Sequence, residues 1–212
     1  MKRILLGIAL CLSISTYTNA DTVYFSGVLD SNSPTFDAPG ASGLGSALQY
    51  YSQTLFTVDT TGAYTFESAS VNSTGTPSDA IDTFLVLYAN AFDPNSPGGQ
   101  LTSNDDFTGS LTVLPGPYAG NGVTSTATGF AGAQPSSRVL DFNLNAGTDY
   151  YLINTSFRDT TYESPTTSNG GPTGTFYTGI TGPGIITVVP EPGALALLGL
   201  TAMGLVLRRR RA

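Results

Sequence analysis

The 212-residue chain has no histidine and no tryptophan, and its only cysteine, Cys11, lies near the N-terminus. Lys2 is the only lysine. These absences remove the usual zinc ligands, the histidine base of a Ser-His-Asp triad, a cysteine nucleophile and a lysine for Schiff-base chemistry. Because no cysteine follows Cys11, no disulfide can hold the main part of the chain, and its hydrophobic core must suffice.

Basic side chains are also scarce. Six of the eight Lys and Arg residues lie at the two ends, so that residues 21–189 contain only Arg138 and Arg158 beside fourteen acidic residues, a net charge of −12. Binding to nucleic acid or to an anionic membrane surface needs clustered Lys and Arg. We therefore expect no nucleic acid partner, whereas divalent cations and neutral polymers are compatible with this charge.

The N-terminus has the order of elements found in secretory signal peptides. Lys2 and Arg3 precede an apolar run, residues 4–12, and small and polar residues then lead to Ala20. The run is too short to span a hydrocarbon layer of about 30 Å comfortably. We predict that residues 1–20 are a signal peptide for the Sec pathway, cleaved after Ala20; a buried N-terminal helix is the alternative.

The C-terminus combines three elements in order. These are the motif Pro190-Glu191-Pro192, the nearly apolar segment 194–207, and the cluster Arg208-Arg209-Arg210-Arg211. As a helix the apolar segment would be about 21 Å long, and snorkelling arginines and local thinning of the bilayer would allow it to cross the membrane. The arginines place the C-terminus in the cytoplasm, which leaves residues 21–189 outside; a permanent anchor is the alternative to a removable tail.

This tail resembles the PEP-CTERM sorting signal of Gram-negative bacteria, and the resemblance covers residues 188–212. It implies that exosortase, a membrane cysteine transpeptidase, recognises Pro190, Glu191 and Pro192 and removes the tail. These residues would then serve recognition and have no catalytic role in the chain itself. Proteins with this signal typically come from bacteria that make exopolysaccharide, biofilm or flocs.

Residues 21–187 are predicted to form one all-β domain. Short runs of Val, Thr, Tyr and Phe alternate with clusters of Gly, Pro, Asn and Ser, and no helical period is evident. The predicted strands are Val23–Leu29, Tyr51–Val58, Ala63–Ser70, Thr83–Tyr88, Val139–Leu144, Tyr150–Thr155 and Gly174–Thr181. The number and spacing of these strands predict a single antiparallel, jelly-roll-like β-sandwich.

Two features lie between the predicted strands. The four-residue segments 59–62 and 145–148 have the composition of hairpin turns. The segment 107–136 is rich in Gly, Pro and Ser, with one apolar stretch at 111–114, and is predicted to be a long surface insertion.

Seven short motifs follow one another along the middle of the chain. They are Val23–Leu29, Asp82–Tyr88, Phe92-Asp93-Pro94, Asn104-Asp105-Asp106, Ser137-Arg138, Ala146–Tyr151 and Gly182-Pro183-Gly184. Their order resembles the β-sandwich common in PEP-CTERM proteins, which is similar to the bacterial pre-peptidase C-terminal domain. The resemblance implies an accessory module that stabilises secreted enzymes or contacts polymers, and some such modules bind calcium.

Carboxylate and amide side chains are densest at Asp79, Asp82 and Asn104-Asp105-Asp106. Calcium is bound by six to eight oxygen ligands of this kind. The first two residues precede the predicted strand Thr83–Tyr88 and the other three follow it, which would separate the groups by about 17–20 Å unless the loop folds back. The candidate calcium ligands are therefore Asn104, Asp105 and Asp106; the alternative is a turn capped by Asp82 and a solvated loop.

The composition leaves only one familiar type of catalysis, a glycoside hydrolase with two carboxylates. Glu67 and Glu163 are the only glutamates between the two ends, and neither lies in a recognisable motif. Tyr118, Tyr162 and Tyr177 lie in or beside predicted loops, where they would stack on sugar rings or belong to the core.

We expect a non-catalytic exported protein at the cell surface or in the extracellular matrix, with a structural or adhesive role in association with exopolysaccharide, biofilm or floc. A calcium-assisted polysaccharide-binding module is the first alternative, and a carboxylate-type hydrolase is the second. The expected partners are the Sec machinery, exosortase and, through segment 194–207, the inner membrane, all of them transient.

Overall fold

The computed structural model describes residues 20–40, 48–71, 80–107, 111–114, 136–162 and 170–189. Within these ranges the chain forms strands and no helix, and every strand pair is antiparallel. The strands are β1 (Ala20–Leu29), β2 (Thr35–Phe36), β3 (Gln49–Val58), β4 (Gly62–Val71), β5 (Thr83–Ala89), β6 (Thr102–Asn104), β7 (Ser136–Leu144), β8 (Tyr150–Ser156), β9 (Gly174–Pro183) and β10 (Ile186–Val189). The prediction of an all-β antiparallel fold is confirmed.

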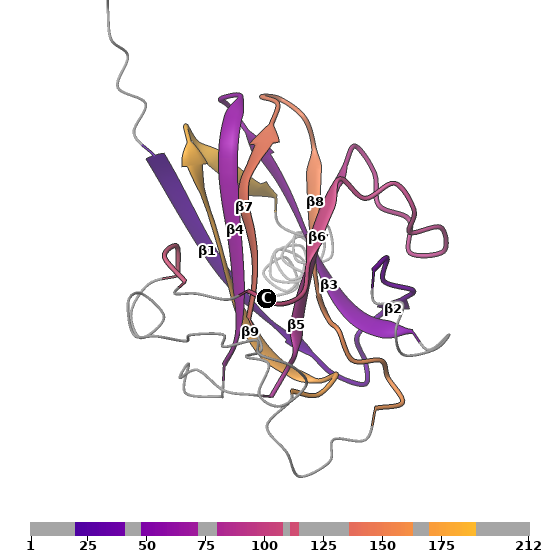
Figure 1. Cartoon of the computed structure of the whole chain (residues 1–212). Helices are drawn as coiled ribbons and strands as arrows, with labels where there is room; N and C mark the ends of the chain where they lie inside the picture. Colours follow the sequence, from indigo (N-terminus) through magenta and orange to yellow (C-terminus); the bar gives the residue numbers. More distant parts are fainter. Residues whose placement is uncertain are drawn as a thin grey trace, which may run out of the picture.

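The strands form two sheets that face each other (Figure 1). Among the described residues, one sheet has the order β1-β9-β4-β7 and the other the order β10-β3-β8-β5-β6, with β2 paired to β3. Strands β1 and β3 to β9 follow the strand order of a jelly roll, in which two Greek keys build two packed sheets. Each of the seven predicted strands corresponds to an observed one, whereas β2, β6 and β10 were not predicted.

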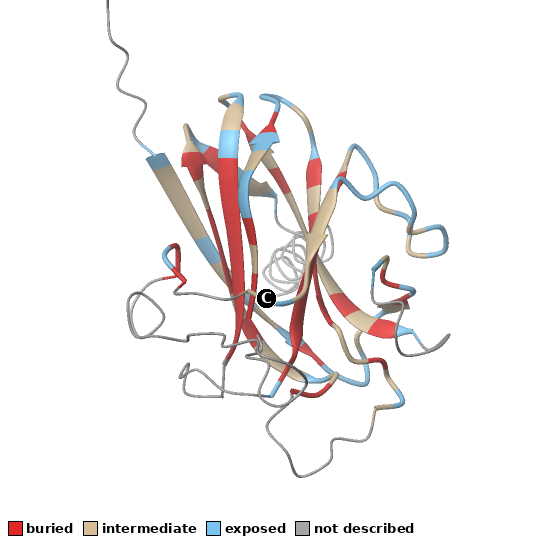
Figure 2. Cartoon of the chain, in the orientation of Figure 1, coloured by how far each residue is buried: buried red, intermediate tan, exposed pale blue. Residues whose placement is uncertain are grey.

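The main core lies between the sheets, where alternate residues of each strand point inward. Phe56 and Val58 of β3 face Tyr64 and Phe66 of β4, and all four are buried. The outer face of β5 is buried as well, because Phe84 and neighbouring aromatic residues pack beneath the loops beside the sheet. Figure 2 shows buried residues along most of β4 and β5 (red), which places both strands inside the molecule.

The two segments predicted to be hairpin turns connect strands of different sheets. Segment 59–62 leads from β3 to β4, and segment 145–148 leads from β7 to β8. The hairpin prediction is therefore wrong, because a short turn rich in polar residues and glycine can bridge two packed sheets as well as two paired strands. The two turns lie against each other, since the Gly147 N–H donates to the Val58 carbonyl at 2.9 Å.

Several predicted features lie outside the described residues. They are residues 1–19 of the signal peptide, the motif Pro190-Glu191-Pro192, the apolar segment 194–207, the cluster Arg208–Arg211, and the side chains Asp79, Tyr118 and Glu163. In the described part of the chain, no helix has the length and apolar character needed to cross a membrane.

Candidate metal centre

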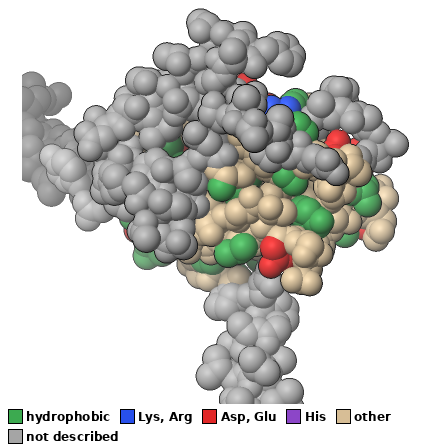
Figure 3. All heavy atoms as spheres, turned by 90° about the horizontal axis from the view of Figure 1, so that it is seen from below, with side chains coloured by type: hydrophobic (Ala, Val, Ile, Leu, Met, Phe, Trp, Pro, Cys, Tyr) green, Lys and Arg blue, Asp and Glu red, His purple; other side chains and the backbone are tan. Residues whose placement is uncertain are grey.

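Three strand ends meet at the lower end of the molecule as drawn in Figure 1. Strand β5 runs antiparallel to β6, with Leu85 opposite Asn104, and antiparallel to β8, with Thr83 opposite Ser156. The residue before β5 and the residues after β6 and β8 therefore share one edge of the sheet. Figure 3 views this end and shows mainly uncharged surface, with a few acidic groups, on the part that the structure describes.

This arrangement brings Asp82, Asp105 and Asp106 together. One carboxylate oxygen from each lies within 4.8 Å of the other two. Asp82 is buried, with 4 % of its surface exposed, whereas Asp105 is half-buried and Asp106 is exposed. The predicted separation of about 17–20 Å is wrong, because the chain after β5 folds back and β6, a strand of three residues, returns along it.

Asn104, the third residue of the predicted calcium set, has a hydrogen-bond partner on a neighbouring strand. Its side-chain Oδ1 accepts a hydrogen bond from the backbone N–H of Arg138 at 2.8 Å. Asn104 therefore connects β6 to β7, and Asp82 is the third acidic residue of the cluster. Asp79, the other residue considered beside Asp82, lies outside the described residues.

Two oxygen atoms of the cluster have no hydrogen-bond partner among the described residues. They are Oδ1 of Asp82 and Oδ1 of Asp105, and both are inaccessible to solvent. The other oxygen of Asp82, Oδ2, lies 3.2 Å from Nε of Arg158. A buried acceptor without a donor costs roughly 1–3 kcal/mol, and more when it is charged.

Among the described residues, Arg158 is the cation nearest to the cluster, and two aromatic rings contact it. Its guanidinium lies 4.9 Å from the ring centroid of Tyr162 and 5.6 Å from that of Phe157. Tyr162, which the sequence suggested as a residue for stacking on sugars, thus stacks on Arg158 within the described structure. The Phe157 N–H also donates to the Asp82 carbonyl at 2.9 Å, which fixes the end of β8 beside the start of β5.

Burial raises the pKa values of all three carboxylates, and neighbouring charges add to or oppose the shift. Burial raises the pKa of Asp82 to about 7, against the opposing effect of Arg158. Burial, together with the charges of Asp82 and Asp106, raises the pKa of Asp105 to about 8. Partial desolvation also raises the pKa of Asp106, the most exposed of the three, although Arg158 opposes the shift. A low-dielectric site with neighbouring like charges disfavours the ionised form.

The cluster is tied to the opposite sheet through Ser137 at the start of β7. The Ser137 hydroxyl donates to the Asp105 carbonyl at 2.7 Å and also contacts the carbonyl of Thr83. The backbone carbonyls of Asp82 and Asp105 are therefore already engaged in hydrogen bonds. The cluster itself offers three carboxylates to a bound cation.

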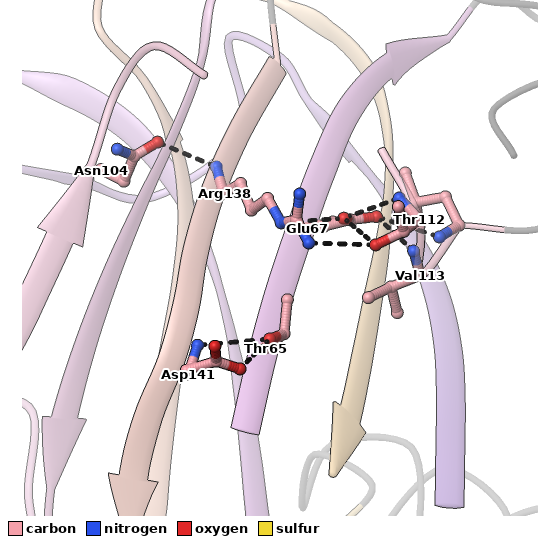
Figure 4. A network of polar contacts seen from close by, with 8 residues as sticks. Thr65, Glu67, Asn104, Thr112, Val113, Arg138 and Asp141 are labelled. Carbon is pink, nitrogen blue, oxygen red and sulfur yellow. Dashed lines mark hydrogen bonds and ion pairs between the residues drawn. The ribbon is translucent and has the colours of Figure 1, made fainter. Parts of the chain in front are cut away.

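A second buried carboxylate, Glu67 of β4, is fully satisfied (Figure 4). Its Oε1 accepts from the backbone N–H of Thr112 at 2.8 Å, and its Oε2 accepts from those of Val113 at 2.7 Å and Leu114 at 3.1 Å. Nε of Arg138 lies 3.2 Å from Oε1. Glu67 therefore acts as an anchor for the backbone of segment 111–114.

Segment 111–114 belongs to the predicted insertion 107–136, and it packs on the outer face of the four-stranded sheet. Leu111 and Leu114 are fully buried there and contact Ala69 and Tyr177. Tyr177 also stacks on Tyr24, with 6.2 Å between the ring centroids. Tyr177, another residue suggested for sugar stacking, thus packs against this segment. No local pattern indicates this contact, because Glu67 and Thr112 are 45 residues apart in the chain.

Comparison with protein families finds the PEP-CTERM protein-sorting motif at residues 188–211. The chain carries a PEP-CTERM sorting motif. The match confirms the recognition made from the C-terminal tail, and it indicates an exported protein that is anchored at the membrane before exosortase processes it. No curated protein matches the chain.

The PEP-CTERM motif begins inside the folded sandwich. Its first two residues, Val188 and Val189, belong to β10 and lie opposite Phe56 and Leu55 of β3. Strand β10 thus continues two residues beyond the predicted end of the domain at residue 187. Pro190 follows β10 directly in the sequence, so no linker separates this strand from the Pro-Glu-Pro segment.

The start of β10 is held by two acidic residues from elsewhere in the fold. Oδ2 of Asp21 accepts from the Ile186 N–H at 3.0 Å, and Oδ1 of Asp59 accepts from the Ile185 N–H at 2.8 Å. Asp21 is the residue that cleavage after Ala20 would leave at the N-terminus. Both predicted processing points of the chain therefore lie directly at the edge of the sandwich.

Proposed function

We propose that the chain is a non-catalytic module of the cell surface or extracellular matrix, with a structural or adhesive role beside exopolysaccharide in a biofilm or floc. The Sec pathway exports it, and exosortase releases it from the inner membrane. The observation that carries the proposal is the continuity of β10 with the sorting motif. It makes the sandwich itself the part of the chain that export delivers.

The buried polar groups support a non-catalytic role. Both oxygens of Glu67 accept backbone hydrogen bonds, which leaves this carboxylate no free oxygen for a glycosidic bond or a water molecule. A glycoside hydrolase needs a second carboxylate about 5–10 Å from the first, and Glu163, the other candidate, lies outside the described residues. If the wild type hydrolysed a glycan and Glu163→Gln did not, the non-catalytic proposal would be contradicted.

The route of export is tested by the mass and terminal sequence of the protein in each fraction of the native host. We expect a chain that begins at Asp21, ends near Val189 and is found outside the inner membrane. The double variant Pro190→Ala, Pro192→Ala should keep its tail and stay in the membrane fraction, whereas Pro94→Ala in a loop should behave as the wild type. A wild-type chain that still ends at Ala212 in the inner membrane would contradict the proposal.

A calcium-assisted polysaccharide-binding module is the second candidate, and the cluster of Asp82, Asp105 and Asp106 favours it. Retention on the host's own exopolysaccharide, with and without a calcium chelator, separates the two candidates. Retention that is lost in chelator and in Asp105→Asn supports the binding module. Matrix localisation without any retention supports the structural role alone.

A further inference from the structure

We propose that Asp82, Asp105 and Asp106 together bind one divalent cation, calcium, beside Arg158. This inference does not depend on the proposed role at the cell surface, because it rests on the geometry of one edge of the sheet. It differs from the expectation drawn from the sequence, which placed the ligands at Asn104, Asp105 and Asp106.

The distances between the carboxylates suit one calcium ion. Calcium lies about 2.3–2.6 Å from each of its oxygen ligands. Two oxygens on opposite sides of an ion at about 2.4 Å are therefore about 4.8 Å apart, and the three carboxylate oxygens lie within 4.8 Å of one another. Magnesium demands a strict octahedron with ligands at about 2.0–2.1 Å and keeps several of its waters, whereas calcium accepts carboxylates in a flexible geometry.

The unpartnered oxygens are an independent indication of a missing ligand. Asp82 is 96 % buried, yet its Oδ1 accepts no hydrogen bond from any described residue, and the same holds for Oδ1 of Asp105. Buried carboxylates in folded proteins are paired, hydrogen-bonded or bound to a metal. A cation between the three side chains would supply the partner that these two oxygens lack.

The balance of charges near the cluster also favours binding of a cation. Three carboxylates and the single guanidinium of Arg158 leave two negative charges without compensation. Arg138 is the only other basic residue in the described ranges, and it is engaged with Glu67. One divalent cation neutralises the remainder. All the ligands offered are oxygens, which suits calcium and not zinc.

The expected affinity is that of a site completed by water. The ligands identified among the described residues are the three carboxylates, and the backbone carbonyls of Asp82 and Asp105 each already accept one hydrogen bond, from Phe157 and Ser137. Calcium needs six to eight ligands, and water must complete the shell. We therefore expect a dissociation constant on the order of 10⁻⁴–10⁻³ M, the range of extracellular calcium modules.

The test is calorimetric titration with calcium chloride. The protein is expressed as the full chain, purified in the form in which the cell exports it, and treated with a chelator that is then removed. We expect one saturable site, with affinity reduced at least about tenfold in both Asp105→Asn and Asp106→Asn. Asp93→Asn, which alters an exposed carboxylate in a turn away from the cluster, serves as the matched control and should leave the affinity unchanged.

Asp106 is exposed, so its replacement tests the site without risk to the fold. An absence of binding heat up to about 10 mM calcium, well above the expected dissociation constant, would overturn the proposal. Equal affinity in the wild type and in Asp106→Asn would overturn it as well. Calcium binding without retention on polysaccharide would uphold the metal site and reject only the second candidate function.

Discussion

Two carboxylate–arginine pairs lie in different parts of the sandwich, and their ion-pair distances are the same. Nε of Arg138 is 3.2 Å from Glu67, and Nε of Arg158 is 3.2 Å from Asp82. The pairs differ in what else surrounds the carboxylate. Glu67 accepts three backbone N–H groups, whereas Asp82 and Asp105 each keep a buried oxygen to which no described residue donates.

This difference separates a structural anchor from a site that needs a ligand. A buried ion pair stabilises a fold when further hydrogen bonds satisfy the remaining lone pairs, and it is costly when they do not. The Glu67 pair meets that condition within the protein. The Asp82 pair, crowded by two more carboxylates, requires a proton or a cation from solution.

The largest effect is expected from breaking the ion pair between Glu67 and Arg138, in which the carboxylate is fully hydrogen-bonded. Glu67→Ala would leave Arg138 and three backbone N–H groups without their acceptor, and should lower the free energy of unfolding by about 3–5 kcal/mol. Urea denaturation measures this change. Added calcium should not restore the lost stability, because Glu67 is not part of the cluster. A loss below about 1 kcal/mol, within the range of an exposed ion pair, would contradict its role as an anchor.

The next effect is a dependence of stability on pH in metal-free protein. The folded-state pKa values of Asp82 and Asp105, about 7 and about 8, lie above the usual value of 3.8. The folded state therefore holds protons that the unfolded state has released, and stability should fall as pH rises from about 4 to about 8. Asp106 adds to the repulsion, and Arg158 reduces it.

The size of this loss is a few kcal/mol, measured by urea denaturation in chelator across the pH range. Asp105→Asn should reduce the slope, because its amide does not ionise. Saturating calcium should also reduce it, because the cation stabilises the ionised carboxylates. Stability that rises between pH 5 and pH 8 in chelator would contradict this account of the cluster.

A smaller effect is expected from calcium at neutral pH. A ligand present at ten to one hundred times its dissociation constant stabilises the folded state by about 1.4–2.7 kcal/mol. Calcium at 10 mM should raise the thermal midpoint of the wild type accordingly. Asp82→Asn should abolish the increase, while a folded Glu67→Gln protein should keep it. An equal increase in Asp82→Asn would locate the calcium elsewhere.

The smallest effect is expected from removing the competing cation. Arg158→Gln should tighten calcium binding by a few-fold, since a neighbouring positive charge no longer opposes the ion. Its stability in chelator should fall, and calcium should restore it. Arg138→Gln is the matched variant in the Glu67–Arg138 pair, and calcium should not restore its stability. Weaker calcium binding in Arg158→Gln would mean that the guanidinium helps to build the site.

The longer strands could be predicted from sequence because their apolar residues alternate or cluster over at least six positions. Strands β2, β6 and β10 contain two, three and four residues, too few to show a period. The composition of the two turns predicts that the chain reverses its direction. It does not determine which of the two sheets the next strand joins, and the prediction of hairpins is therefore wrong. The sequence pattern therefore predicts the fold class but not which strands pair with one another.

The candidate site was found only in part for the same reason. Asp105 and Asp106 belong to a dense acidic run that the sequence displays. Asp82 was set aside because an extended chain separates it from them, and only the return of β6 along β5 removes that separation. The anchor at Glu67 depends on a contact with Thr112, 45 residues away, that no local pattern records.

The most direct test of the difference between the two pairs is a crystal structure of the exported protein grown in calcium. We expect one strong peak within about 2.3–2.6 Å of an oxygen from each of Asp82, Asp105 and Asp106, and no peak beside Glu67. A cluster that holds no ion, with Asp105 instead bonded to Asp82 through a shared proton, would contradict the metal site and leave the cluster as a buried acid pair.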